Sequence, residues 1–134
     1  MKVKVLGCYG GIAPGQGMTS FLVNDTVALD AGGLSFALPV DRQAMVKDVF
    51  ISHAHLDHTC CLPFLIDNSF ASPGFSLRIY GIHEVVTAAD AFIKQNPMGE
   101  VIVRLDMDKA APGAGFFDKP PSNSSMRCTC RLIP

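Results

Sequence analysis

Residues 53–58 read His-Ala-His-Leu-Asp-His, so the chain must fold in a way that presents three imidazoles and one carboxylate on a single short turn. Neutral imidazole nitrogens and carboxylate oxygens are good ligands for Zn²⁺ and its neighbours in the first transition row. A core or surface turn that holds three histidines by chance is the alternative, and the density of the cluster argues against it. The sequence predicts a metal site with His53, His55, Asp57 and His58 as ligands.

The spacing within this cluster predicts two metal positions rather than one. In an extended segment alternate side chains share a face, so His53, His55 and Asp57 would project one way and His58 another. Paired ions about 3.5–4 Å apart bind the attacking and the leaving oxygen of a hydrolytic displacement and lower the pKa of water. This chemistry cleaves phosphate or acyl esters.

The residues on either side of the cluster predict which secondary-structure elements flank it. The run Lys47–Ser52 contains β-branched and aromatic residues without Gly or Pro, which is typical of a strand. The apolar stretch Leu62–Ile66 has Pro63 near its start, which favours the first turn of a helix. We therefore expect the order strand, ligand turn, helix.

Further strands and helices are expected along the chain. Asn24-Asp25 predicts a hairpin, and the glycine-rich stretch Gly7–Gly17 predicts a loop. That loop lacks the Gly-Lys-Ser/Thr ending of nucleotide-binding loops, so we expect a turn beside the metal site rather than a phosphate cradle. The expected strands are Lys2–Leu6, Thr19–Val23, Thr26–Asp30, Asp48–Ser52 and Ser76–Tyr80, and the expected helices are Val40–Met45, Leu62–Ser69 and His83–Lys94.

Three motifs in order resemble the metallo-β-lactamase superfamily. Leu6–Gly11 is similar to its opening glycine loop, Thr19–Val23 to its second strand, and Val27–Gly32 to its third strand ending in Asp-Ala-Gly. The cluster at 53–58 is similar to the signature that follows, in the form that class II cyclic-nucleotide (cAMP) phosphodiesterases carry. The resemblance covers about residues 1–85.

This resemblance implies a fold and a set of roles. The fold would be an α/β (α+β) metallo-β-lactamase-like αββα sandwich, of which this chain supplies the N-terminal half only. His53 and His55 would ligate the first metal, Asp57 and His58 the second, and Asp57 would also be catalytic by orienting the attacking water. Asp30 would hold a ligating histidine by its other ring nitrogen, or would instead cap backbone N–H groups at a turn. The implied cofactor is Zn²⁺, two per complete site, with Mn²⁺ or Fe as further candidates.

The chain also departs from the family. Members take another His, a bridging Asp and a final His from their second half, whereas the one remaining histidine here, His83, reads as a helix-start residue. We therefore predict a truncated or frame-altered chain, with missing ligands supplied by a longer form or by another chain. The predicted organisation is a half domain at 1–95 and a divergent, disordered tail at 96–134, rich in breakers from about Pro112. Half a sandwich would expose an apolar sheet face, which predicts a homo-oligomer or poor solubility.

The charge of the chain restricts its possible partners, and its cysteine content predicts its compartment. A net charge of −1 with no basic run argues against extended nucleic-acid binding, and no apolar run reaches the length of a membrane span. A small phosphodiester substrate is the expected partner. Five cysteines without a signal peptide predict a reducing cytoplasm and no disulfide framework. Cys60 and Cys61 are expected to be small buried residues, and Cys128-Thr129-Cys130 lacks an accompanying His for a metal site.

Three functions follow. The first is a cyclic-nucleotide phosphodiester hydrolase that uses a metal-activated water. The second is another superfamily hydrolase, such as a tRNA 3′-processing nuclease, although its expected Lys/Arg surface is missing from the sequence. The third is a non-catalytic fragment that binds metal weakly.

Overall fold

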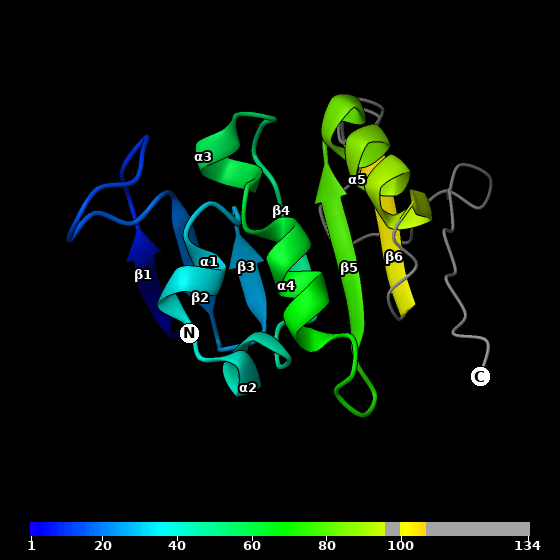
Figure 1. The fold of residues 1–134 in the computed structure, drawn as a ribbon, viewed down its shortest axis with the longest axis horizontal. Coiled ribbons are helices and arrows are strands. Elements are labelled where there is room, and N and C mark those ends of the chain that lie inside the picture. The colour runs from blue at the N-terminus through cyan, green and yellow to red at the C-terminus, as the bar shows by residue number, and fades with distance from the viewer. Residues whose placement is uncertain (96–99, 107–134) are drawn as a thin grey trace.

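One mixed sheet forms the framework of the computed structural model, which describes residues 1–95 and the backbone of residues 100–106. The sheet has the order β1-β2-β3-β4-β5-β6, so each strand lies beside its neighbour in sequence (Figure 1). The first three strands are antiparallel, and β3 to β6 are parallel. The strands are β1 (Val3–Gly7), β2 (Ser20–Val23), β3 (Val27–Leu29), β4 (Asp48–Phe50), β5 (Ser76–Gly81) and β6 (Glu100–Asp106). The predicted α/β class is confirmed.

The turn between β2 and β3 shows why these strands pair. Asn24 and Asp25 have φ values of 49° and 64°, and the N–H of Thr26 donates to the carbonyl of Val23 at 3.2 Å. Positive φ at both central residues matches the right-handed twist of the flanking strands, and Asn and Asp tolerate it better than most residues. The predicted hairpin is therefore confirmed, with a turn of the primed kind.

Five helices connect the strands within the described residues, and they lie on a single face of the sheet (Figure 1). Helices α1, α4 and α5 contribute buried apolar side chains to the core against that face. They are α1 (Leu34–Ala37), α2 (Val40–Gln43), α3 (Leu56–Thr59), α4 (Leu62–Ser69) and α5 (His83–Gln95). Alternate strand residues point to this face and are buried, such as Leu22, Ala28, Val49 and Ile79. Burial of these strand residues together with the apolar side chains of α4 and α5 is the main source of stability.

The opposite face of the sheet carries an apolar row that runs from β1 to β5. Its members are partners in the strand register, so their side chains lie on the same side. Val5 and Leu29 are exposed, and the Phe50 and Tyr80 rings stack with centroids 4.4 Å apart. Within the described residues all helices lie on the other face, which agrees with the expected exposed sheet face. The row is Val5, Phe21, Leu29, Phe50 and Tyr80.

The structure corrects and extends the predicted elements. All five predicted strands and the three predicted helices are present, with ends that differ by up to two residues. The short helices α1 and α3 were not predicted, and α3 begins inside the ligand cluster. Strand β6 lies within the range 96–134 assigned to a divergent tail, and it pairs with β5 in parallel. Residues 96–99 and 107–134, with Cys128 and Cys130, lie outside the described residues, so the prediction of disorder there stays a prediction.

No helix in the described part of the chain combines the length and apolar character needed to cross a membrane.

Candidate metal centre

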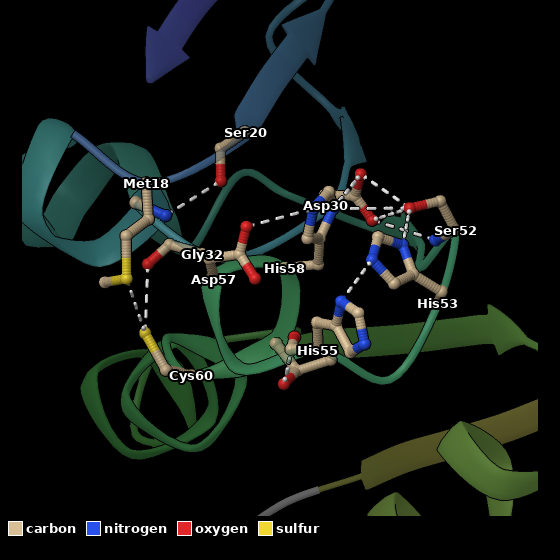
Figure 2. Close-up of polar contacts among 12 residues, drawn as sticks. Met18, Ser20, Asp30, Gly32, Ser52, His53, His55, Asp57, His58 and Cys60 are labelled. Carbon is tan, nitrogen blue, oxygen red and sulfur yellow. Dashed lines mark hydrogen bonds and ion pairs between the residues drawn. The ribbon is translucent and has the colours of Figure 1, made fainter. Parts of the chain in front are cut away.

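The cluster lies where two parallel strands end. Asp30 directly follows β3, and Ser52 and His53 follow β4, which is the parallel neighbour of β3. Because parallel strands end at the same edge of a sheet, residues far apart in sequence meet there, and such edges commonly bind ligands in α/β proteins. Helix α3 then brings Asp57 and His58 to the same place (Figures 1 and 2).

The segment 30–32 anchors the ligand turn through its backbone. The N–H of Ala31 donates to the carbonyl of His58 at 2.7 Å, and the N–H of Cys61 donates to the carbonyl of Ala31 at 2.9 Å. A Cβ at Gly32 would collide with the carbonyl of Asp57, so only glycine permits this approach. The Asp-Ala-Gly sequence therefore fixes the position of α3 relative to β3.

The ligand turn is not extended as predicted from its spacing. His55 is extended with ψ 148°, but the helix α3 begins at the next residue, and the N–H of His58 donates to the carbonyl of His55 at 3.0 Å. Asp57 and His58 are therefore consecutive residues of a helical turn, and the prediction that His53, His55 and Asp57 share one face of an extended segment is wrong. The helix forms because the backbone groups of residues 55–60 bond within the turn, as the further bond from the N–H of Cys60 to the carbonyl of Leu56 shows.

The structure brings the four predicted ligands together as two pairs of donor atoms (Figure 2). Nε2 of His53 lies 3.1 Å from Nδ1 of His55. Oδ2 of Asp57 lies 3.2 Å from Nε2 of His58. The rings of His53 and His58 are in contact, with centroids 3.9 Å apart, so the two pairs are adjacent. The grouping matches the assignment implied by the resemblance, His53 with His55 and Asp57 with His58.

The separations within the donor pairs are compatible with one metal ion each, although neither pair makes a full coordination shell. Ligand atoms about 2.0–2.2 Å from an ion at a tetrahedral angle lie roughly 3.3 Å from one another, close to both observed separations. Among the described residues, however, no group of three or more His, Cys, Asp or Glu side chains is arranged to hold a metal ion. Each pair would need further ligands, and metal binding by these residues stays a prediction.

The contact between Asp57 and His58 requires a cation between the two side chains. Nδ1 of His58 lies 2.8 Å from Oδ2 of Asp30, and a carboxylate can only accept, so this nitrogen carries a hydrogen. In a neutral ring Nε2 is then an acceptor, and it faces the carboxylate oxygen of Asp57, which is another acceptor. A cation between them removes this conflict, either as a second ring proton or as a metal ion.

Asp30 is held in an unusual conformation at this site. Its φ is 58°, in the left-handed region, and its side chain is only 9% exposed. Oδ1 accepts hydrogen bonds from the backbone N–H of Ser52 at 2.8 Å and from its hydroxyl at 2.9 Å. Asp30 therefore contacts a histidine and also satisfies a backbone donor, which are the contacts that its two expected roles require.

Sequence reasoning missed Ser52. Its hydroxyl lies 2.9 Å from each carboxylate oxygen of Asp30 and 3.0 Å from Nδ1 of His53. The only signal in sequence is a hydroxyl residue at the end of the strand that precedes the cluster. The glycine loop lies beside the site as expected, since a Cβ on Gly10 would be 3.6 Å from Oδ2 of Asp57.

The remaining candidates lie at the margin of the centre or outside it. His83 is the exposed first residue of α5, as predicted. The thiols of Cys60 and Cys61 both donate to the carbonyl of Gly32, at 3.1 and 2.9 Å. Burial, together with the neighbouring Cys61 and Asp57, raises the pKa of Cys60 to about 11, so this thiol is a poor ligand at neutral pH.

The likeness of this chain to known proteins lies in its fold. No protein-family model and no curated protein matches the chain. Among solved structures, the metallo-beta-lactamase fold protein YhfI from Bacillus subtilis matches 77% of this chain at a TM-score of 0.54 and 23% identity. The match covers 45% of YhfI, so the chain spans less than half of that protein. At this identity the likeness concerns the fold alone, and the chain shares the metallo-β-lactamase fold over the matched part.

Proposed function

We propose that this chain carries part of the metal site of a hydrolase, and that the substrate is a small phosphodiester, with a cyclic nucleotide as the first candidate. The observation that carries the proposal is the pair of acceptors Oδ2 of Asp57 and Nε2 of His58, 3.2 Å apart beside a second donor pair. Two acceptors at this separation need a ring proton or a metal ion between them. With a metal ion in each pair, hydrolysis is the chemistry that paired divalent cations support best.

The roles of the residues follow from their donor atoms. His53 and His55 would hold one ion, and Asp57 and His58 the other. A bound divalent ion would supply Lewis acidity at a phosphoryl oxygen and would lower the pKa of water. Oδ1 of Asp57 has no hydrogen bond within the described residues, and its side chain is 21% exposed. This oxygen is free to accept a hydrogen from water and thereby to orient the attacking lone pair.

The substrate class rests on charge and on the resemblance of the ligand motif. The chain has a net charge of −1 and no basic run, which does not favour a long polyanionic partner. A small phosphodiester carries one negative charge, and two cations are sufficient to neutralise it. The likeness to cyclic-nucleotide phosphodiesterases in residues 53–58 supports the cyclic nucleotide as first candidate.

A second candidate, a non-catalytic metal-binding module, is favoured by the ligand count. The described residues contain no group of three or more potential ligands around one point. An ion held by two protein ligands exchanges readily, and weak binding without turnover would result.

Metal content and hydrolysis measured on the same preparation test both candidates. Elemental analysis is paired with hydrolysis of a bis-aryl phosphodiester, cyclic AMP and a precursor tRNA, for wild type and for Asp57→Ala. Asp67→Ala is the matched control, because Asp67 is an exposed carboxylate of α4 outside the cluster. Both candidates require metal in the wild type.

The outcomes separate the candidates. About two metals per chain, with turnover of the small phosphodiesters lost in Asp57→Ala and kept in Asp67→Ala, support the hydrolase. Cleavage of precursor tRNA in place of the small substrates would move the assignment to a nuclease. Bound metal without turnover supports the non-catalytic module, and a chain free of metal after incubation with Zn²⁺ rejects both candidates.

A further inference from the structure

We infer that the hydroxyl of Ser52 is a positioning group that decides which ring nitrogen of His53 carries the hydrogen. The inferred tautomer has the hydrogen on Nδ1 and a lone pair on Nε2, which faces Nδ1 of His55 at 3.1 Å. The consequence for metal binding rests on the proposed function, whereas the tautomer itself does not.

The geometry around Ser52 places one hydroxyl among several partners. Oγ lies 2.9 Å from Oδ1 and 2.9 Å from Oδ2 of Asp30. It lies 3.0 Å from Nδ1 of His53 and 3.3 Å from Nδ1 of His58. The backbone N–H of Ser52 also donates to Oδ1 of Asp30 at 2.8 Å, which fixes the serine against the carboxylate independently of the hydroxyl (Figure 2).

The number of hydrogens that each group can donate determines the direction of each hydrogen bond. A hydroxyl has one hydrogen to donate, and a carboxylate has none. The hydrogen of Ser52 must therefore point to Asp30, because otherwise two oxygen atoms would face each other at 2.9 Å with no hydrogen between them. The oxygen of Ser52 then accepts, and the hydrogen in its contact with His53 comes from Nδ1 of that ring.

The same carboxylate also determines which ring nitrogen of His58 carries the hydrogen. Its Nδ1 lies closer to Oδ2 of Asp30, at 2.8 Å, than to the hydroxyl of Ser52, at 3.3 Å, so it donates to Asp30. Asp30 thus acts on His58 directly and on His53 through Ser52. In both neutral rings Nε2 keeps its lone pair, and each of these nitrogens belongs to a different donor pair. One buried carboxylate therefore prepares both pairs for a cation.

The tautomer can be read without any metal. In chelator-treated protein labelled with ¹⁵N-histidine, long-range proton–nitrogen correlation spectra distinguish a protonated ring nitrogen from a bare one. The spectra are recorded at pH 8. His53→Ala assigns the signals of His53. Ser52→Ala removes the hydroxyl while keeping the backbone N–H, and Ser52→Thr keeps both groups.

The expected result is specific to one ring. Wild type and Ser52→Thr show His53 with hydrogen on Nδ1, and Ser52→Ala shifts His53 toward the other tautomer or a mixture. His58 keeps its hydrogen on Nδ1 in all three proteins, because Asp30 is intact. A wild-type His53 with hydrogen on Nε2, or a His53 tautomer unchanged in Ser52→Ala, would overturn the inference.

A Zn²⁺ titration of the same proteins tests the consequence separately. Loss of a group that orients a ligand histidine typically weakens metal binding by about 10- to 100-fold, so Ser52→Ala should bind Zn²⁺ that much more weakly and Ser52→Thr should restore affinity. A changed tautomer with unchanged affinity would reject the role of Ser52 in metal binding. If the wild type binds no Zn²⁺, the proposed function fails, and the tautomer measurement still decides the inference about Ser52.

Discussion

Oδ2 of Asp30 lies 2.8 Å from Nδ1 of His58, although 28 positions separate these residues in the chain. The contact exists because β3 and β4 are parallel neighbours that end at one edge of the sheet, and because Ala31 bonds to the backbone of α3. It turns the second ring nitrogen of His58 toward Asp57. The orientation of a candidate metal ligand is therefore determined by a residue that precedes the ligand motif.

Substitutions at Asp30 should separate its charge from its backbone conformation. Asp30→Asn should weaken Zn²⁺ binding by about 10- to 100-fold, because the amide is a poorer acceptor for His58. Asp30→Ala should be less stable than Asp30→Asn by about 1–2 kcal/mol or more, because Asn tolerates the left-handed φ of 58° and can still accept the backbone N–H of Ser52, whereas Ala does neither. Urea unfolding in chelator measures the second effect, and equal stabilities would show that the backbone at residue 30 is not strained.

Two fully buried serines should respond in opposite directions to the same substitution. Oγ of Ser20 accepts the N–H of Gly33 at 3.0 Å, whereas Oγ of Ser69 has no partner within the described residues. Ser20→Ala should cost about 1–3 kcal/mol, because it leaves a buried N–H unsatisfied. Ser69→Ala should be neutral or stabilising by about 1 kcal/mol. The midpoints of urea unfolding measure both effects. A large loss of stability in Ser69→Ala would show that the Ser69 hydroxyl has a partner.

The reactivity of Cys60 should depend on pH in a way that an ordinary thiol does not show. Only the thiolate reacts with alkylating reagents, and the pKa of Cys60 is raised to about 11, mainly by burial. Because the ordinary value is 9.0, its thiolate fraction near pH 8 should be about 100-fold below that of an ordinary thiol. Peptide mapping after iodoacetamide treatment in chelator should show Cys8, which is exposed, modified long before Cys60. Equal rates at pH 8 would contradict the raised pKa.

Much of the framework could be predicted because its signals are local. The β-branched runs before residues 30 and 52 mark β3 and β4, and Asn24-Asp25 marks the hairpin through its tolerance of positive φ. Helix α3 could not be predicted, because four residues are too few to show a helical period of apolar side chains. The alternation of side chains in an extended segment therefore does not hold at Asp57, where the helix has already begun.

The candidate site was predictable in composition and not in its internal connections. Imidazole and carboxylate density predicted the cluster at residues 53–58, and the resemblance predicted which of its residues form pairs. Ser52 was missed because its role depends on the distance from Oγ to Asp30, a residue 22 positions away in sequence. Such contacts arise from strand register, which local patterns do not contain.

The apolar row across the outer face of the sheet predicts that the chain associates with a second copy of itself. Val5 and Leu29 are 60% and 41% exposed, and within the described residues no helix lies over them. Sheets with apolar faces pack face to face, and a second copy presents the same row in a self-complementary position. Light scattering coupled to size-exclusion chromatography should show a mass above that of one chain, increasing with protein concentration.

The double substitution Val5→Lys and Leu29→Lys should shift this equilibrium to the monomer, because each lysine adds a charge to the face that would be buried. Phe36→Lys is the control, since Phe36 is 66% exposed on α1 and lies away from the row. Dissociation in the double variant but not in the control assigns association to the sheet face. Dissociation in Phe36→Lys alone would place the contact on the helical side, and a monomeric wild type at every concentration would reject association with a second copy.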